Sequence, residues 1–300
     1  RFHRNTLADS KQNIHYHYDI GNAFYRLWLD EDMVYTCAYF ADAGMTLEQA
    51  QKAKLDLVCR KLGLRPGLHV AEAGCGWGSL ALHMAGQYGV TVKAYNISRE
   101  QVAYARNRAA AAGLADRIEF IEDDYRNLRG DFDAFVSVGM LEHVGTENYS
   151  VLGSVIDRCL KDEGRGLIHS IGRNRAMPMN SWTGKRIFPG SYAPSLREMM
   201  DVLEPGGFSV LDVENLRLHY AHTLVKWLER FEEKHEQVRK LYDDAFVRCW
   251  RLYLASSAAA FLAGNLQLFQ VVFARFSNNA IPLTRAHLYR DGEAGYRQFR

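Results

Sequence analysis

Short apolar runs alternate with helical patterns from about Leu68 to Ile171, and this alternation organises the first half of the chain. The apolar runs predict strands at about 68–73, 90–95, 117–121, 132–138 and 166–171. Amphipathic periodicity predicts helices at about 46–63, 78–88, 99–112 and 147–160. Strands that alternate with helices are typical of a parallel sheet covered by helices, so the pattern predicts an α/β core.

The pattern changes after Gly172, where a loop rich in arginine, methionine, proline and aromatic residues runs through Pro194. This loop is typical of an insertion over the carboxyl edge of the sheet, and a short helix and a strand near 207–214 follow it. Two long amphipathic helices come next, and a strand from Leu268 to Phe276 closes the fold. Their apolar stripes are Leu224, Trp227, Leu228 and Phe231 in the first helix, and Phe246, Trp250, Tyr253, Leu254, Ser257 and Phe261 in the second.

The chain has 300 residues, of which 48% are hydrophobic and 24% charged, so it can bury a full core. We expect a single domain over 1–300 with a core, a cap, an insertion and a lid. The core is expected at about 46–172, 206–217 and 265–277, with an N-terminal helical cap at 1–45, an insertion at 173–205 and a helical lid at 218–264. The first residue is Arg1 rather than a methionine, so any preceding domain lies outside this sequence.

Charge and hydropathy exclude several function classes. The formal net charge is only +2, so we expect no nucleic-acid partner, although local basic clusters could still face acidic lipids. The longest apolar stretch, Leu254–Ala263, contains two serines and falls short of the roughly 20 residues that cross a bilayer. No signal-peptide pattern is present.

The cysteines and histidines give no pattern of a metal site. The five cysteines lack a C-x-x-C pair, and their odd number indicates reduced thiols of a cytoplasmic protein. His15 and His17 are two residues apart with no obvious third ligand, so we expect no metal. The cysteines are Cys37, Cys59, Cys75, Cys159 and Cys249.

A glycine-rich turn follows the first predicted strand, at 70–78 in the sequence Val-Ala-Glu-Ala-Gly-Cys-Gly-Trp-Gly. Gly74 and Gly76 let the backbone bend tightly and approach a ligand at the N-terminus of the next helix. The dinucleotide fingerprint needs a glycine at position 79, which is Ser79, whereas this loop reads G-x-G-x-G. With Glu72 two residues before the first glycine, the turn favours S-adenosylmethionine over NAD. The alternative, a tight turn without a ligand, would not need three glycines in five residues.

Polar residues also follow the second and third predicted strands. Asn96 and Ser98 lie where a nucleotide-binding fold places a group that hydrogen-bonds the ribose hydroxyls. Asp124 and Tyr125 could meet an adenine, because a carboxylate accepts from its amino group and a ring stacks on it. The alternative for this second pair is a solvated acidic turn.

Ordered motifs along nearly the whole chain resemble the cyclopropane fatty acid synthases and their relatives that modify mycolic acids. The motifs are His17–Asn22, Tyr35–Phe40, Glu72–Gly78, Gly139–Gly145, Ile168–Gly172, Ile187–Gly190 and Gln267–Phe273. The resemblance implies a class I S-adenosylmethionine-dependent methyltransferase, with a Rossmann-like seven-stranded sheet and a helical lid insertion. It implies S-adenosylmethionine at Tyr35, Thr36, Glu72, Gly74, Cys75, Gly76, Asn96, Ser98, Gln101, Asp124 and Tyr125.

The resemblance also implies a substrate and a base. The substrate would be the double bond of an unsaturated phospholipid acyl chain, and the product a cyclopropane ring formed through a carbocation. The base would be a bound bicarbonate ion, held by the side chains of Glu142, His169 and Tyr220 and by backbone groups of Cys37 and Ile171. Glu142 would accept the bicarbonate hydroxyl proton, while the histidine and the tyrosine donate to its other oxygens.

Each of these residues also has a structural interpretation. His169 could be a satisfied core histidine, and Glu142 could be a carboxylate favoured at a helix start. Cys37 has no basic partner evident in the sequence, and alkene methylation needs no thiolate, so we expect it to act through its backbone. Two positions depart from the family pattern: family members often have threonine at the position of Asn96 and cysteine at the position of Ser257. The serine argues against covalent catalysis at that position.

The insertion carries a mixture of cations and aromatic rings that could meet a membrane surface. These residues are Trp182, Lys185, Arg186, Phe188 and Tyr192, and a solvated loop is the alternative. We expect a cytoplasmic enzyme that contacts the inner face of the membrane peripherally, and the resemblance adds that family members are commonly dimeric. Two further functions stay open: a related lipid C-methyltransferase giving a methyl-branched or methylene product, and a non-catalytic lipid- or cofactor-binding module.

Overall fold

The computed structural model describes residues 20–289. His15, His17, Tyr18 and Asp19 lie outside the described residues, as does the first part of the predicted N-terminal cap, residues 1–19. Within 20–45 the chain forms one short helix, α2 (Asn22–Tyr25), and otherwise runs as turns and extended loop.

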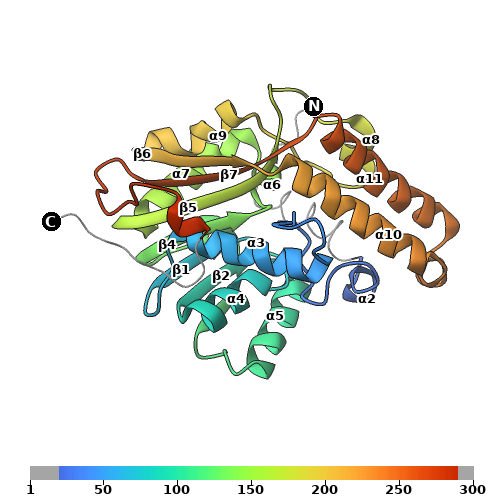
Figure 1. The fold of residues 1–300 in the computed structure, drawn as a ribbon, viewed down its shortest axis with the longest axis horizontal. Helices are drawn as coiled ribbons and strands as arrows, with labels where there is room; N and C mark the ends of the chain where they lie inside the picture. The colour runs from blue at the N-terminus through green and yellow to red at the C-terminus, as the bar shows by residue number, and fades with distance from the viewer. Residues whose placement is uncertain (1–19, 290–300) are drawn as a thin grey trace.

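A seven-stranded sheet forms the centre of the described chain, in the order β3-β2-β1-β4-β5-β7-β6 (Figure 1). The strands are β1 (His69–Ala73), β2 (Thr91–Asn96), β3 (Ile118–Glu122), β4 (Phe132–Val138), β5 (Leu160–Gly172), β6 (Phe208–Asn215) and β7 (Gln267–Arg275). Strands β1 to β5 are parallel, and β7 runs antiparallel to both of its neighbours. The carboxyl ends of the parallel strands therefore meet at one edge, where ligands bind in such sheets.

Helices cover both faces of the sheet, as Figure 1 shows. On one face α3 (Leu47–Leu62), α4 (Ser79–Tyr88) and α5 (Arg99–Ala111) bury their apolar stripes against β1, β2 and β3. On the other face α7 (Tyr149–Cys159) and α9 (Leu196–Leu203) pack against β4, β5 and β7. Side chains alternate along each strand, so both faces of the central strands are apolar and the sheet is buried between two helical layers.

A third apolar core lies beyond the sheet edge and joins the N-terminal segment to two long helices, α10 (Arg217–Leu241) and α11 (Asp244–Leu262). Its centre is aromatic: Trp28 meets Trp227 with ring centroids 5.6 Å apart, and Phe24 meets Trp250 at 4.8 Å. Such edge-on ring pairs stabilise packing beyond the area that they bury. The two long helices thus occupy the segment predicted as a lid.

The shorter elements complete the described chain. They are α6 (Leu141–Val144), α8 (Ser181–Arg186) and the 3-10 turns η1 (Tyr125–Asn127), η2 (Thr146–Asn148), η3 (Glu204–Gly206) and η4 (Ala286–Leu288). Within 20–289, none of the helices has the length and apolar content that a membrane span needs.

Two sequence expectations need correction. Strand β5 starts at Leu160, six residues before the expected start. The prediction missed this first part of the strand because Lys161 to Glu163 are charged and exposed and form no apolar run. The insertion was expected as a loop, but it contains α8, whose N-cap Asn180 accepts hydrogen bonds from two backbone N–H groups. The other predicted strands and helices lie within one or two residues of their expected bounds.

Candidate active site

A cavity of about 700 Å³ opens where the parallel strands β1, β2 and β4 end. Its walls come from the glycine turn, the loops after these strands, the loop at 33–36, the insertion and both long helices. Its volume lies in the range of pockets that enclose small molecules, roughly 300–1,000 Å³.

Most of the residues predicted to bind cofactor or substrate line this cavity. They are Tyr35, Thr36, Glu72, Gly74, Cys75, Gly76, Asn96, Gln101, Asp124, Tyr125, Glu142, Ile171 and Tyr220. Cys37, Ser98 and His169 are not among its lining residues in the described chain, and all three are buried. The fold therefore collects at one sheet edge side chains that are far apart in the sequence.

The glycine turn has the shape of a ligand cradle. Gly74, Gly76 and Gly78 have φ angles of +84°, +53° and +83°, which side chains disfavour. A Cβ atom on Gly76 would meet nothing within 4 Å, so this position faces open space, whereas one on Gly78 would lie 2.7 Å from the Cβ atom of Ala105. The turn thus needs glycine for its backbone angles, for access to the cavity and for close packing of α5.

The loop after β2 is held to the glycine turn by Asn96. Its Nδ2 donates to the Gly76 carbonyl at 3.2 Å and to Gln101 Oε1 at 2.8 Å, while its Oδ1 accepts from the Ser98 N–H at 3.2 Å. The Ser98 hydroxyl caps α5 by accepting from the Gln101 N–H at 3.4 Å. The structure thus gives Ser98 a helix-capping position, and its contact with ribose stays a prediction.

The loop after β3 presents a carboxylate and an aromatic ring to the cavity. Asp124 accepts from the Arg126 N–H at 2.9 Å and pairs with its guanidinium at 3.0 Å. The same guanidinium lies 5.0 Å from the centroid of the Tyr125 ring. Burial raises the pKa of Tyr125 to about 12, so the ring is neutral at physiological pH.

A buried lysine, Lys54 on α3, lines the cavity next to the loop at 33–36. It was not identified from the sequence as a candidate site residue. Its side chain is 2% exposed, and its Nζ donates to Thr36 Oγ1 at 2.8 Å. Burial lowers the pKa of Lys54 and raises that of Glu72, and the charge of each opposes the shift of the other. Glu72 Oε2 is buried and makes no hydrogen bond within the described chain. The only signal in the sequence was a lysine on the apolar stripe of a helix.

Glu142 lies at the start of the short helix α6, and only one of its two carboxylate oxygens accepts a hydrogen bond within the described chain. Its Oε1 accepts from the Ile171 N–H at 2.7 Å, while Oε2 is buried and has no hydrogen bond among the described residues. Burial raises the pKa of Glu142 to about 7. In this structure the backbone N–H of Ile171 therefore positions the carboxylate.

The remaining predicted members of the anion pocket lie close behind the cavity wall or in it. Cys37 is fully buried and its Sγ donates to the Ala38 carbonyl at 3.1 Å, and burial raises the pKa of its thiol. His169 lies two residues before Ile171 on β5, and its Nε2 is buried without a hydrogen bond in the described chain. Tyr220 lies on α10 and packs on the Phe261 ring, with centroids 4.7 Å apart.

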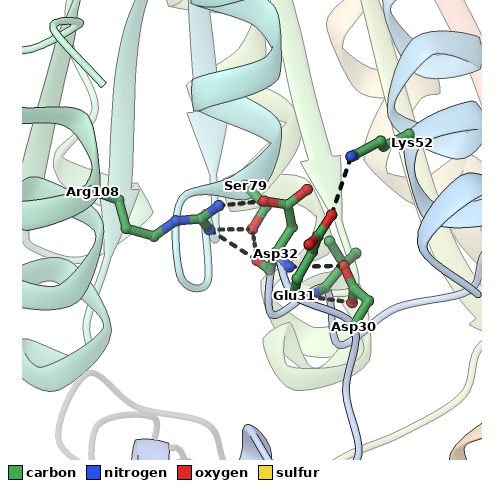
Figure 2. A network of polar contacts seen from close by, with 7 residues as sticks. Asp30, Glu31, Asp32, Lys52, Ser79 and Arg108 are labelled. Atoms are coloured by element: carbon green, nitrogen blue, oxygen red, sulfur yellow. Dashed lines mark hydrogen bonds and ion pairs between the residues drawn. The ribbon is translucent and has the colours of Figure 1, made fainter. Parts of the chain in front are cut away.

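The loop at 30–34 within the N-terminal cap (the cap loop) is anchored to the glycine turn by a network of polar contacts that Figure 2 shows. Arg108 on α5 pairs with Asp32 at 2.5 Å and also donates to Ser79 Oγ at 3.0 Å, and Ser79 follows the last glycine of the turn. Asp30 accepts from the Val34 N–H at 2.9 Å, which closes the loop on itself. This network fixes the segment that continues into Tyr35 and Thr36 at the cavity.

We expect Arg108→Met to weaken S-adenosylmethionine binding about tenfold, because part-buried charge-assisted hydrogen bonds contribute roughly 1.5–3 kcal/mol and their loss frees the cap loop. Isothermal titration calorimetry of the purified variant measures the affinity. Arg99→Met, at the exposed start of the same helix, serves as the matched control. An affinity unchanged from the wild type would show that the network does not hold the cofactor site.

We expect Glu142→Gln to be more stable than the wild type at high pH. The pKa of Glu142 is about 7 in the folded protein, raised from 4.5, so ionisation of this group lowers the free energy of unfolding of the wild type as pH rises through that window. This decrease in the free energy of unfolding approaches about 3 kcal/mol above pH 7, and it is absent in the variant because glutamine does not ionise. Urea unfolding at pH 5 and pH 8 measures this. A stability difference between variant and wild type that stays constant with pH would contradict the assignment.

Two tyrosines tie the cap to the long helices across the cavity. The hydroxyls of Tyr35 and Tyr253 lie 2.8 Å apart, and Phe188 from the insertion meets the Tyr253 ring edge-on at 5.6 Å. Tyr253 was seen in the sequence only as part of an apolar stripe, because its hydroxyl contact joins residues 218 positions apart.

Within 20–289 no group of three or more histidine, cysteine or acidic side chains could hold a metal ion.

Comparisons with known proteins now identify this arrangement. A family model described as mycolic acid cyclopropane synthetase matches residues 5–271. The chain belongs to this family. As a member of the cyclopropane synthetase family it is an S-adenosylmethionine-dependent methyltransferase of class I fold.

Relatives of the cyclopropane synthetase family carry two kinds of name. A cyclopropane-fatty-acyl-phospholipid synthase of Escherichia coli K12 is 42% identical over 270 residues, covering 90% of this chain and 69% of the relative. A probable fatty acid methyltransferase of Pseudomonas putida is 39% identical over 288 residues, covering 92% of this chain and 73% of the relative. Among solved structures, the mycolic acid cyclopropane synthase CmaA1 complexed with SAH and CTAB matches with a TM-score of 0.83 and 30% identity, covering 88% of this chain and 97% of that one.

Proposed function

We propose that this enzyme transfers the methyl carbon of S-adenosylmethionine to the double bond of an unsaturated phospholipid acyl chain and that the product is a cyclopropane ring. One observation carries the proposal: Glu142 Oε2, in the cavity wall, and His169 Nε2, two residues before the lining residue Ile171, are buried polar atoms without hydrogen bonds in the described chain. Buried polar groups are rarely left unsatisfied, so this pair fits a small polar ligand. The names of the relatives supply the substrate class.

The residues around the glycine turn fit S-adenosylmethionine, which when bound supplies an electrophilic methyl group on a sulfonium centre. The open face at Gly76 would admit the cofactor, and Asn96 and Gln101, which both line the cavity, would face the ribose. Asp124 with Tyr125 suits the adenine. Tyr35 and Thr36, the latter backed by Lys54, would face the amino-acid end.

An alkene is a weak nucleophile, so its methylation leaves a carbocation on the acyl chain that must lose a proton before the ring closes. Water would quench this cation, and Phe188, Phe261 and Leu224 give part of the cavity wall an apolar surface that would hold little water around a bound acyl chain. The faces of aromatic rings such as Tyr220 also attract a cation. The cavity therefore combines apolar and aromatic walls that suit a cation on an acyl chain.

The buried polar atoms behind the wall fit a bicarbonate ion, which when bound supplies the base. Glu142 Oε2 would accept the hydroxyl proton of that ion, since its other oxygen is held by the Ile171 N–H. Burial keeps the pKa of His169 well below its usual value, so the ring is neutral and can offer one N–H donor. Tyr220 would supply a second donor.

We also propose that the insertion contacts the membrane surface peripherally. Helix α8 exposes Lys185 and Arg186, and Met177 before it is 44% exposed next to the cavity. Each basic residue near an anionic surface contributes about 1 kcal/mol to binding, and an apolar side chain can enter the interface.

Reversing both charges of α8 by Lys185→Glu and Arg186→Glu is expected to weaken binding to anionic phospholipid vesicles at least tenfold. Vesicle sedimentation at physiological salt measures the bound fraction, and Arg197→Glu, exposed on α9, is the control for the reversal of one positive charge elsewhere. Equal binding of the double variant and the control would remove α8 from the membrane contact.

A second function has a specific observation in its favour. Relatives include a tuberculostearic acid methyltransferase of Mycobacterium tuberculosis, 36% identical over 87% of this chain and 64% of that protein. In such an enzyme the same cation would undergo a hydride shift and lose a proton to give a methylene product, or lose a proton directly to give a methyl-branched alkene, and the same buried pocket would serve.

Proton NMR of the product separates the two functions. The purified protein is incubated with S-adenosylmethionine, bicarbonate and vesicles of unsaturated phospholipid, and the extracted acyl chains are examined. We expect upfield ring protons. A vinylic or methyl-branch signal without them would overturn ring formation, and tight cofactor binding without turnover would favour a binding module.

A further inference from the structure

A row of polar side chains behind the cavity fixes the chemistry of His169. We propose that Gln270, oriented by Lys61, is a positioning residue that holds His169 in the neutral tautomer with its proton on Nε2. The inference rests on the proposed function only for the use of that proton, because the tautomer itself is a property of the fold. Neither Gln270 nor Lys61 was a candidate in the sequence.

The row follows the register of the sheet. His169 on β5 stands opposite Gln270 on β7, and Gln270 stands opposite Glu214 on β6. Directly opposed residues point to the same face of a sheet, so the three side chains form one line across three strands. Lys61, near the end of α3, meets this line from the helical layer.

The distances define a chain of contacts. Lys61 Nζ lies 2.5 Å from Glu214 Oε2 and 2.7 Å from Gln270 Oε1, and Gln270 Nε2 lies 3.0 Å from His169 Nδ1. Every contact is within hydrogen-bond distance. Lys61, Gln270 and His169 are 2%, 0% and 1% exposed, so water does not compete for their polar atoms.

The direction of these hydrogen bonds follows from the donor inventory. An ammonium group only donates, so the Gln270 atom that faces Lys61 must be its carbonyl oxygen. The amide nitrogen of Gln270 then faces His169, and because it too only donates, Nδ1 of the ring must accept. A neutral imidazole has one acceptor and one donor nitrogen, so its proton is on Nε2.

Glu214 completes the row by balancing the buried charge of Lys61. Its side chain is 27% exposed and its carboxylate pairs with the ammonium group, which opposes the effect of burial on that group. An uncompensated buried ammonium would tend to lose its proton, and it could then accept from an amide turned the other way. The charge of Glu214 therefore helps to fix the orientation of Gln270.

The tautomer decides what His169 offers to the pocket. With Nδ1 satisfied by Gln270, the buried Nε2 has no hydrogen bond in the described chain and presents an N–H. An N–H donor attracts an anion, whereas the lone pair of the opposite tautomer would repel it. The interpretation of His169 as a satisfied core histidine thus holds for Nδ1 and fails for Nε2.

Nitrogen-15 NMR of the full chain with labelled histidine reads the tautomer directly, without activity. The His169 signals are assigned by their loss in His169→Gln. We expect Nε2 protonated and Nδ1 unprotonated in the wild type, and a protonated Nδ1 in the nearly isosteric Gln270→Glu, because a carboxylate only accepts. Lys61→Met is expected to populate both tautomers, and Lys52→Met, exposed on the same helix, leaves the wild-type pattern.

A protonated Nδ1 in the wild type, or an unchanged tautomer in Gln270→Glu, would overturn the inference. A kinetic readout tests its use: Gln270→Glu is expected to raise the KM for bicarbonate at least tenfold with the KM for S-adenosylmethionine unchanged. A changed tautomer with unaltered bicarbonate kinetics would contradict the role of His169 in the proposed function and the positioning role of Gln270 in catalysis, while the tautomer assignment would stand.

Discussion

Replacing Glu142 with glutamine is expected to lower turnover at least a hundredfold while S-adenosylmethionine binds within about threefold of the wild-type affinity. Removing a group aimed at developing charge in a dry site costs about 10²–10³ in kcat, whereas the cofactor contacts lie elsewhere on the cavity wall. Glutamine keeps an oxygen for the Ile171 N–H, so the local backbone is expected to persist. Activity is expected to recover in part at high bicarbonate, because the weakened pocket fills at a higher concentration.

Initial rates over a bicarbonate series and calorimetric binding of S-adenosylmethionine measure this prediction. Glu147→Gln, an exposed glutamate in the following turn, controls for the loss of one carboxylate nearby. A loss of cofactor affinity in Glu142→Gln would place the residue in the cofactor site instead. Full activity in the variant would remove the carboxylate from the chemistry altogether.

Replacing Lys54 with methionine is expected to weaken S-adenosylmethionine binding about a hundredfold. The substitution removes the donor to Thr36 Oγ1 and leaves the buried Glu72 without its neighbouring positive charge. Leaving a buried carboxyl group without its compensating charge costs several kcal/mol, and the damage falls on two residues that line the cavity, Thr36 and Glu72.

A second variant separates binding from folding. The double variant Lys54→Met with Glu72→Gln leaves no buried carboxyl group without its compensating charge, so we expect its thermal stability to recover. Because Glu72 itself lines the cavity, the affinity that tests Lys54 is that of the single variant, measured at a temperature at which circular dichroism shows it folded. Lys52→Met is the matched control, since that side chain is exposed and pairs with Glu31 at 3.2 Å. If folded Lys54→Met binds the cofactor as tightly as the wild type, Lys54 does not support the cofactor site.

The sheet could be predicted from sequence because its central strands are buried on both faces and so appear as continuous apolar runs. Strand β5 shows the limit of this signal, since its charged, exposed start at Lys161 to Glu163 has no apolar pattern. Helix α8 was missed for a related reason: it is a six-residue segment whose start depends on one capping side chain, Asn180. Short elements of this kind leave little periodicity to detect.

The candidate site was predictable where its residues lie in local motifs, as in the glycine turn and at Glu142. Lys54 and Gln270 were not found, because their partners Thr36 and His169 are 18 and 101 residues away. Such contacts depend on which strands are neighbours and on their register, which sequence pattern alone does not give. The fold also placed Ser98 as a helix cap, a distinction that depends on the direction of one side chain.

The most direct measurement uses S-adenosylmethionine whose transferred methyl group carries three deuterium atoms, with unsaturated phospholipid vesicles and bicarbonate. Deuterium NMR and mass spectrometry of the acyl chains then show where the proton was lost. Ring closure by deprotonation of the transferred carbon predicts two deuterium atoms at the upfield ring position. Retention of all three in a methyl branch, or two at a vinylic position, would contradict ring formation by this enzyme.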